Sequence, residues 1–188
     1  MTGTILSSQS LPLVDDPQDQ SVRDQFNGFA GGSGILNLHR MMAHAPTLMK
    51  ASGELALALR RDTTLPRSLA EIIILRIAQL FACDYVWHRH VTLARANGST
   101  EVQLEALAHW SHSDAFTPRE KAAIEFCEAA AQQLPVGPKL FATLRQHFSP
   151  REIVEMTIVA GSYVSTVIFV KALAVPAEKP PPKEPPGD

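Results

Sequence analysis

The sequence predicts an all-α fold, and three observations support this prediction. Apolar residues recur at helical spacing along most of the chain, two proline-bearing capping boxes mark helix starts, and Asn-Gly hairpin signals between alternating runs are missing. The 188 residues are 45% hydrophobic and 19% charged, which suits one globular domain and excludes wholesale disorder. We expect an N-terminal extension over residues 1–23, one domain over residues 24–176 and a disordered proline-rich tail over residues 177–188.

The first half of that domain is predicted to hold four helices. Pro46 precedes a helix from Thr47 to Arg60, and Pro66 begins a second helix whose apolar residues lie nearly all round, as in a buried helix. A third begins near Cys83 and ends at the C-cap pair Asn97-Gly98, and a short helix then runs to His109. The predicted ranges are 47–60, 66–80, 83–97 and 99–109.

Three further helices are predicted in the second half. Thr117 and Ser149 each precede Pro-Arg-Glu, which offers an N-cap hydroxyl, proline at the first position and glutamate at the third. The predicted ranges are 117–134, 138–147 and 150–173. Leu134 is expected on the apolar face of the first of them. The last contains Val, Ile and Thr, which also favour strands, but it is too long for one strand.

Composition excludes several classes of protein. The net charge of −2 gives no electrostatic footprint for nucleic acid or for a membrane anchor, and two cysteines exclude a disulfide framework. The longest uncharged apolar stretch, from Met156 to Val170, counts 15 residues, short of the about 20 that a membrane span needs. The first 15 residues lack the basic region and the apolar run of a signal peptide, so we expect none. We therefore expect a cytoplasmic protein that binds neither membranes nor nucleic acid.

The segment from Cys83 to His90 is the most informative for chemistry. Cys83, Val86 and His90 fall at i, i+3 and i+7, on one face of a helix, so the thiol and imidazole lie two turns or about 10.5 Å apart in rise. The two side chains can line one pocket, but they are too far apart along the helix to form a hydrogen bond with each other. Cys83 lies at the helix start, where the dipole favours a thiolate. The simpler interpretation is a small buried residue, which we also assign to Cys127.

Glu71 stands out because it lies in a helix otherwise filled with Ile and Leu. A buried carboxylate costs several kcal/mol unless it is paired or protonated, which makes Glu71 a candidate for a functional site. Tyr85, Trp87 and His88 are candidates for substrate binding, although aromatic residues here also suit packing. His88 and His90 point about 200° apart around a helix, so we expect no metal site, and we expect no cofactor.

These residues resemble the signature of the carboxymuconolactone decarboxylase/AhpD-like superfamily. In the alkylhydroperoxidase branch the pattern is Glu, eleven residues, Cys-x-x-Cys, three residues, His, and Glu71, Cys83 and His90 match it. Further similar segments extend the resemblance over about residues 35–178. They are Asn37-Leu38-His39-Arg40, His44-Ala45-Pro46, Leu65-Pro66-Arg67, Ala94-Arg95-Ala96-Asn97-Gly98 and Lys171-Ala172-Leu173-Ala174-Val175.

The resemblance implies an AhpD-like helical domain whose central helical hairpin carries Glu71 on one helix and Cys83 and His90 on the next. It also implies a homo-oligomer, a trimer or hexamer, acting on a small molecule. The chain departs from the alkylhydroperoxidase pattern at Val86, which replaces the second cysteine. Valine cannot resolve a sulfenic acid, so a self-resolving peroxidase of that branch is excluded.

Three functional hypotheses remain. The first is a lyase of the carboxymuconolactone decarboxylase type, with His90 as proton donor, Glu71 orienting it, Cys83 lining the pocket, and Arg76, Arg89 or His88 facing the substrate carboxylate. The second is an oxidoreductase with peroxiredoxin-like activity, in which Cys83 attacks a peroxide and an external thiol reduces it. The third is a non-catalytic oligomeric binding protein on the same scaffold.

Overall fold

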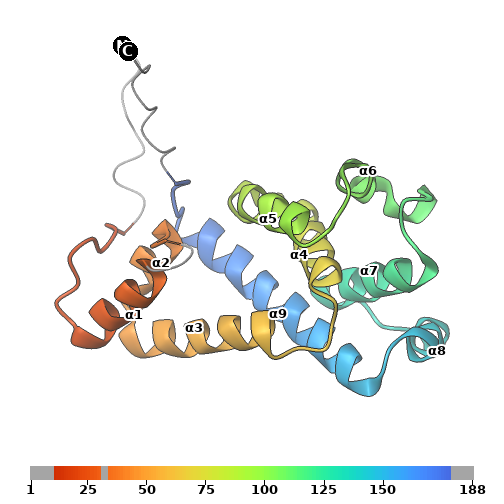
Figure 1. Ribbon diagram of the computed structural model, residues 1–188, viewed down its shortest axis with the longest axis horizontal. Coiled ribbons are helices and arrows are strands. Elements are labelled where there is room, and N and C mark those ends of the chain that lie inside the picture. The colour runs from red at the N-terminus through yellow and green to blue at the C-terminus, as the bar shows by residue number, and fades with distance from the viewer. Residues whose placement is uncertain (1–10, 31–33, 179–188) are drawn as a thin grey trace, which may run out of the picture. The chain divides into compact units, whose positions relative to one another are not determined.

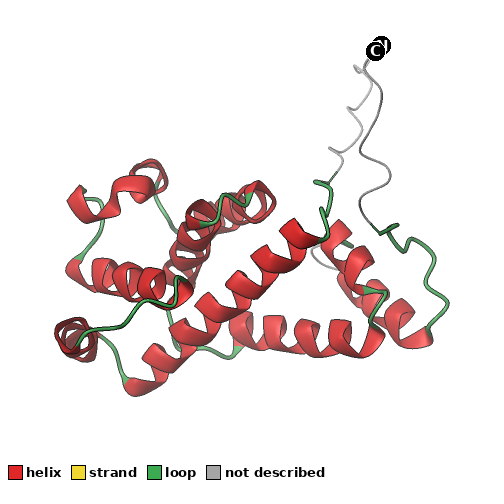
Figure 2. Cartoon of the chain, turned by 180° about the vertical axis from the view of Figure 1, so that it is seen from behind, coloured by secondary structure: helices red, strands yellow, loops and turns green. Residues whose placement is uncertain are grey.

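The computed structural model describes residues 11–30 and 34–178, and every regular element among them is helical (Figure 2). The all-α prediction is therefore confirmed. Figure 1 shows the helices in chain order. They are α1 (Gln20–Ala30), α2 (Asn37–Met42), α3 (Pro46–Arg61), α4 (Arg67–Leu80), α5 (Asp84–Ala96), α6 (Glu101–Ala106), a 3-10 helix (Leu107–His112), α7 (Pro118–Ala131), α8 (Pro138–His147) and α9 (Pro150–Ala172).

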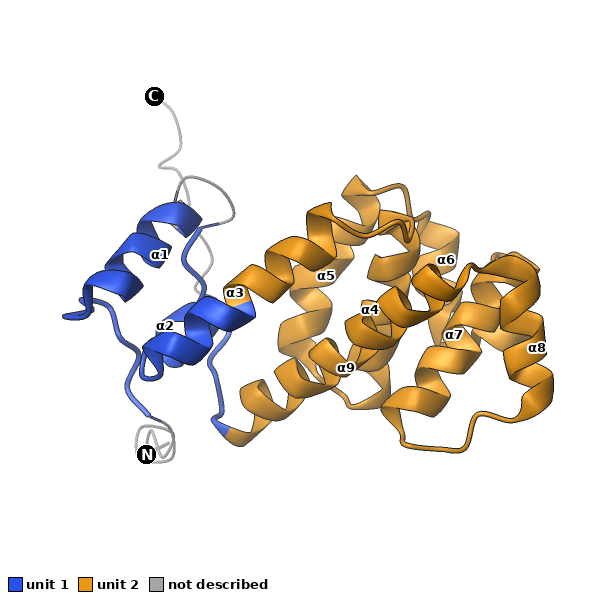
Figure 3. Cartoon of the chain, turned by 90° about the horizontal axis from the view of Figure 1, so that it is seen from below, with its two compact units in different colours: residues 1–52, 173–188 blue, residues 53–172 orange. Residues whose placement is uncertain are grey.

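The chain divides into two compact units, residues 1–52 with 173–188 and residues 53–172, and the division falls within α3 (Figure 3). The predicted extension, domain and tail have different boundaries and stay a prediction. α1 begins at Gln20, inside the predicted extension, and residues 179–188 of the predicted tail lie outside the described residues.

The smaller unit has its own apolar cluster. Val22 and Phe26 of α1 lie with Ala43 and Met49 in this buried group. Polar contacts tie its ends together, since the Asn37 backbone N–H donates to the Glu178 carboxylate at 2.8 Å. Buried apolar residues and long-range hydrogen bonds from Asn37 therefore stabilise this unit locally.

The larger unit is built around α4, which contacts α5, α7 and α9. Nine of its fourteen residues are buried, as the all-round apolar pattern predicts for a central helix. Ile72 and Leu75 pack in a cluster with Ala94 of α5 and Ile124 of α7. A helix covered on several sides holds its side chains in fixed positions, which is what a buried polar residue such as Glu71 needs.

The predicted helix starts are confirmed by their hydrogen bonds. Thr117 Oγ1 accepts from the Glu120 N–H at 3.3 Å while Glu120 Oε2 accepts from the Thr117 N–H at 2.8 Å. Ser149 and Glu152 form the same reciprocal pair. Gly98, at φ +96°, ends the turn after α5 as the Asn-Gly pair predicts. The face prediction fails at Leu134, which lies beyond the end of α7 and is exposed.

α9 is only partly the buried element that the sequence predicts. By length and composition it is the one helix of the described segments that could cross a membrane, with a mean hydropathy of 1.8 over 18 residues, of which 39% are buried. Met156, Val159 and Ala160 are buried, and α9 contacts α4 and α7. Packing against neighbouring helices and a buried Glu155 are typical of a core helix in a globular unit.

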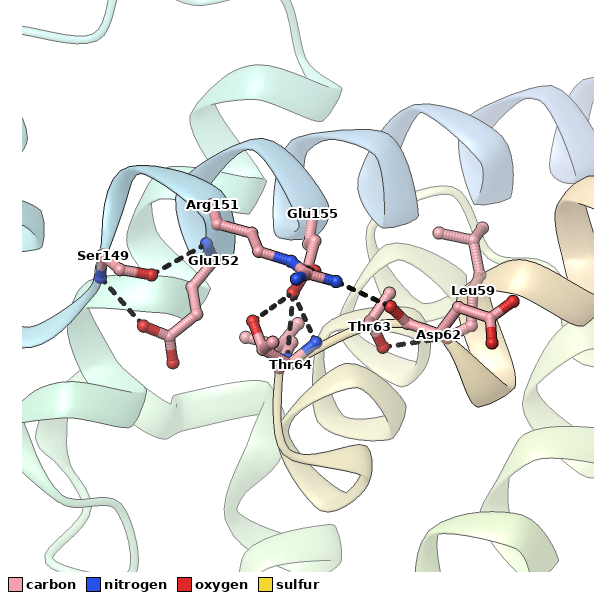
Figure 4. Close-up of polar contacts among 9 residues, drawn as sticks. Leu59, Asp62, Thr63, Thr64, Ser149, Arg151, Glu152 and Glu155 are labelled. Carbon is pink, nitrogen blue, oxygen red and sulfur yellow. Dashed lines mark hydrogen bonds and ion pairs between the residues drawn. The ribbon is translucent and has the colours of Figure 1, made fainter.

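Glu155 fastens the start of α9 to the segment that precedes α4 (Figure 4). Its Oε2 accepts from the Thr64 N–H at 2.9 Å, the Thr64 hydroxyl at 2.9 Å and the Leu65 N–H at 3.0 Å. Its Oε1 accepts from Arg151 Nε at 2.8 Å, and Arg151 Nη2 donates to the Asp62 carbonyl. The buried carboxylate is fully partnered, which repays its desolvation.

Candidate functional site

Glu71 of α4 and His90 of α5 meet in the interior of the larger unit. Glu71 is 0% exposed, and its Oε2 lies 2.7 Å from His90 Nδ1. The predicted hairpin therefore brings this carboxylate and this imidazole together. A carboxylate can only accept, so the ring nitrogen donates and His90 carries a hydrogen on Nδ1. This arrangement leaves Nε2 as the nitrogen that can exchange a proton with another group.

The second oxygen of Glu71 is also occupied. Arg67, one turn earlier on α4, donates from Nη2 to Glu71 Oε1, and its side chain is mostly buried. The two hydrogen bonds offset the cost of burying the Glu71 carboxylate in an apolar helix, because both of its oxygens have donors. Arg67 was not among the predicted site residues.

Tyr163 of α9 completes the surroundings of His90. The two rings meet edge to face, with centroids 4.9 Å apart and an interplanar angle of 87°. Burial and the nearby Glu71 charge raise the pKa of Tyr163 to about 12, against the opposing effect of Arg67 and Arg60. The phenol is therefore neutral at physiological pH. Tyr163 too was missed by sequence reasoning.

Cys83 is the N-cap residue of α5, as predicted, and is 3% exposed. Its N–H donates to the Ala78 carbonyl at 2.9 Å, and its own carbonyl accepts from the Trp87 N–H at 3.1 Å. Within the described residues no hydrogen bond joins its sulfur to His90. Val86, which stands between them along the helix face, is also buried. The thiol and the imidazole thus share a helix and a face without direct bonding.

Cys127 lies in the core, as the sequence predicts. It is buried on α7, its sulfur donates to the Met156 carbonyl at 3.8 Å, and burial raises the pKa of its thiol. A thiol of this kind is unreactive. Cys127 therefore offers no resolving group for Cys83.

The three predicted substrate contacts fall in different environments. Trp87 is partly buried against the apolar cluster that contains Ile72 and Leu75, Tyr85 is half-buried, and His88 is exposed. The structure brings none of them into the hydrogen-bonded group of Arg67, Glu71 and His90. Their role in substrate binding stays a prediction.

An open pocket of about 420 Å³ lies beside the turn between α4 and α5. Its lining residues are Arg76, Ala78, Gln79, Ala82, Asp84, Trp87 and Ala108. They include the two neighbours of Cys83 in the chain but none of Glu71, Cys83 and His90. Arg76 is paired there with Glu128 and Gln79, and Trp110 Nε1 also donates to Glu128. Arg76 therefore serves a separate polar cluster.

Sequence signals existed for one of the two missed residues. Arg67 lies four residues before Glu71, the spacing at which oppositely charged side chains meet on a helix. Tyr163 lies within the apolar run of α9, and no local pattern indicates that it reaches His90. In the described part of the chain, no group of three or more His, Cys, Asp or Glu side chains is arranged to hold a metal ion.

Sequence comparison gives one family and two curated relatives. Residues 46–129 match the Carboxymuconolactone decarboxylase family. The chain is 30% identical over 121 residues to the uncharacterised protein YnjA of Escherichia coli, covering 63% of this chain and 66% of that one. It is 27% identical over 101 residues to the uncharacterised protein YdfG of Bacillus subtilis, covering 53% and 69%. The matches thus span about two thirds of the relatives' lengths.

Solved structures share the fold. An uncharacterised peroxidase-related protein from Silicibacter sp. TM1040 superposes with a TM-score of 0.80 at 17% identity, covering 95% of this chain and 96% of that one. A peroxidase-related protein with an alkylhydroperoxidase AhpD core, from Ralstonia eutropha JMP134, gives 0.77 at 17% identity over 90% and 93%. The debrominase Bmp8, as a cysteine-to-alanine variant in complex with 2,3,4-tribromopyrrole, gives 0.73 at 19% identity over 90% and 94%.

The family match covers α4 and α5, and the solved structures extend the similarity of fold to nearly the whole chain. Glu71, Cys83 and His90 lie within the matched residues. Residues 46–129 therefore belong to the Carboxymuconolactone decarboxylase family, and the chain shares the fold of structures with an alkylhydroperoxidase AhpD core.

Proposed function

We propose that this protein is a cofactor-free enzyme that transfers a proton during decarboxylation of a small carboxylated, lactone-type substrate. The observation that carries the proposal is the buried hydrogen bond between Glu71 and His90. A carboxylate on Nδ1 orients the ring and stabilises the imidazolium, so that Nε2 can give a proton to a substrate atom. Membership of a decarboxylase family supports the choice of reaction.

The decarboxylation uses His90 as its general acid and no cofactor. The bond between the substrate carbon and its carboxylate breaks, carbon dioxide leaves, and the electron pair moves into the lactone carbonyl as an enolate. The His90 imidazolium, which carries a hydrogen on both ring nitrogens, then donates its Nε2 proton to a carbon of the enolate, and Nε2 takes up a new proton from solvent. The substrate carboxylate loses its charge in this step, so a site with little water favours the reaction.

Turnover of carboxymuconolactone by the purified protein tests the proposal. We expect carbon dioxide release by the wild type, and we expect Cys83→Ser to keep most of the rate, because Cys83 only lines the site in this mechanism. Absence of turnover, or its loss in Cys83→Ser but not in Cys127→Ala, would contradict the proposed chemistry.

A second candidate is thiol-dependent peroxide reduction, favoured by the position of Cys83 at the start of a 13-residue helix. The debrominase Bmp8, crystallised as a cysteine-to-alanine variant with 2,3,4-tribromopyrrole, adds support for thiol chemistry on this fold. The Cys83 thiolate would attack the peroxide, release an alcohol and become a sulfenic acid. Two equivalents of an external thiol would then restore it, giving water and a disulfide.

Peroxide consumption in the presence of dithiothreitol separates the two candidates. The lyase proposal predicts equal, slow rates for wild type and Cys83→Ser, because neither uses a protein thiol. A fall of tenfold or more in Cys83→Ser, with Cys127→Ala as the matched buried control, would instead establish the thiol enzyme.

We also propose that the protein is a homo-oligomer that buries the outer face of α9. Val154, Ile158 and Ile168 are exposed there, with Ile168 62% exposed, and Gly161 and Ser165 lie between them at spacings of three and four residues. An apolar stripe of this kind is typical of helix–helix contacts between subunits.

Light scattering is expected to give the mass of a trimer or hexamer, and Ile168→Glu is expected to shift the oligomeric state toward monomer. A monomeric wild type would refute this.

A further inference from the structure

We propose that Arg67 and Tyr163 are positioning residues that hold Glu71 ionised and keep a hydrogen on His90 Nδ1, so that Nε2 is left as the nitrogen that exchanges a proton. The inference deepens the proposed function and rests on it for its catalytic consequence. Its physical content, the state of the His90 ring, is measurable without any substrate.

Arg67 acts through Glu71. Its Nη2 and His90 Nδ1 occupy the two oxygens of one buried carboxylate, at Oε1 and Oε2 respectively. A guanidinium remains charged at all physiological pH values, so it favours the ionised carboxylate even in the interior. An ionised Glu71 can only accept, which requires the hydrogen on Nδ1.

Arg67 also limits how strongly Glu71 attracts a second proton to His90. Without the guanidinium, the imidazole would be the remaining hydrogen-bonded partner of the buried carboxylate among the described residues. With it, the charge of the carboxylate is already compensated by a cation other than His90. A group that gives and takes protons in a reaction needs this balance.

Tyr163 acts on the orientation of the ring. Its edge-to-face contact with His90 comes from α9, while Glu71 comes from α4, so the imidazole is held from two helices. One hydrogen bond leaves a ring free to swing about it, and an aromatic wall removes that freedom. The phenol remains neutral, as described above, and so adds no charge beside Glu71.

The groups that face His90 can be named by element. α4 contributes Glu71 and Arg67, α9 contributes Tyr163, and on α5 itself Cys83 lies two turns away on the same face. Arg60 of α3 acts on the Tyr163 hydroxyl. Arg67 is the cation directly bonded to the partner of His90, so its removal is expected to dominate any change in proton binding.

Nitrogen-15 NMR of histidine-labelled full-length protein tests the proposal. In the wild type we expect His90 at high pH to show a protonated Nδ1 and an unprotonated Nε2. In Arg67→Gln the Glu71 carboxylate loses its charged donor, so the two His90 nitrogen shifts are expected to depart from their wild-type values. Arg67→Lys, which keeps the charge, is expected to stay near the wild type.

Tyr163 has its own pair of variants. Tyr163→Phe keeps the aromatic edge and should leave the two nitrogen shifts distinct, whereas Tyr163→Ala should bring them toward an average of the two tautomers. Arg95→Gln is the matched control. Arg95 lies on α5, the helix of His90, and forms an exposed ion pair with Glu101 of α6. This variant should change nothing at His90.

Three results would overturn the inference. They are a wild-type His90 with its hydrogen on Nε2, unchanged His90 nitrogen shifts in Arg67→Gln, and equal spectra for Tyr163→Phe and Tyr163→Ala. The first is measured on unaltered protein, so an unfolded variant cannot hide the answer. If the NMR results hold but carboxymuconolactone is not turned over, the proposed function fails while the positioning of His90 stands.

Discussion

Replacing His90 by Gln is expected to lower the catalytic rate by about 10²–10⁴-fold, the usual contribution of a general acid or base. An amide can still donate to Glu71 from the His90 position, so the buried carboxylate keeps a partner and the fold is retained. What is lost is the ring nitrogen that exchanges a proton with the substrate. Steady-state kinetics on the active substrate should show the loss in kcat, with a smaller change in KM.

The comparison variant for this experiment is His109→Gln, which changes an exposed histidine in the 3-10 helix after α6. It should retain the wild-type rate. Glu71→Gln should lie between the two, because an amide at that position no longer stabilises the imidazolium. A His90→Gln protein that is as active as His109→Gln would remove His90 from the mechanism.

Glu155→Ala is expected to lower the free energy of unfolding by about 3 kcal/mol, the scale for breaking a buried charged network. The variant leaves the Thr64 and Leu65 N–H groups and Arg151 without their shared acceptor. Urea denaturation followed by circular dichroism measures the change. Glu101→Ala is the matched control, because its pair with Arg95 is exposed and its loss should lower the stability far less.

The Glu155 contribution should also depend on pH. Burial by itself would raise the pKa of this carboxyl, but hydrogen bonds from Arg151, Thr64 and Leu65 outweigh burial and hold the pKa below its ordinary 4.5. A lowered folded pKa means that the stabilisation is present above pH 4.5 and is lost as pH falls through the folded value. The gap in stability between wild type and Glu155→Gln should therefore be larger at pH 6 than at pH 3. A constant gap would contradict this assignment.

Local sequence rules predicted most of the helices of the larger unit. The capping boxes at Thr117 and Ser149 and the Asn97-Gly98 terminus rely on contacts within a few residues, which the sequence shows directly. Spacing along a single helix placed Cys83 and His90 on one face. The meeting of Glu71 with His90 needed the helical hairpin as well, and the family resemblance supplied that expectation.

Local sequence patterns could not predict the contacts between segments that lie far apart in the chain. Tyr163 and Glu155 lie in α9 and reach partners on α5 and on the segment before α4, and such partners depend on how the helices pack. Leu134 continues an apolar period, but the helix ends before it, so the side chain is exposed. α1 is polar enough to read as an extension, yet its Val22 and Phe26 are buried in the smaller unit.

The short hairpin of α4 and α5 carries the whole Arg67–Glu71–His90 group and Cys83 within 24 consecutive residues, 67 to 90. Among the described contacts of this group, Tyr163 alone comes from a more distant helix. A group held by one helix pair tolerates sequence change in the loops and helices that do not touch it, and a debrominase of similar fold accords with a scaffold that carries more than one function.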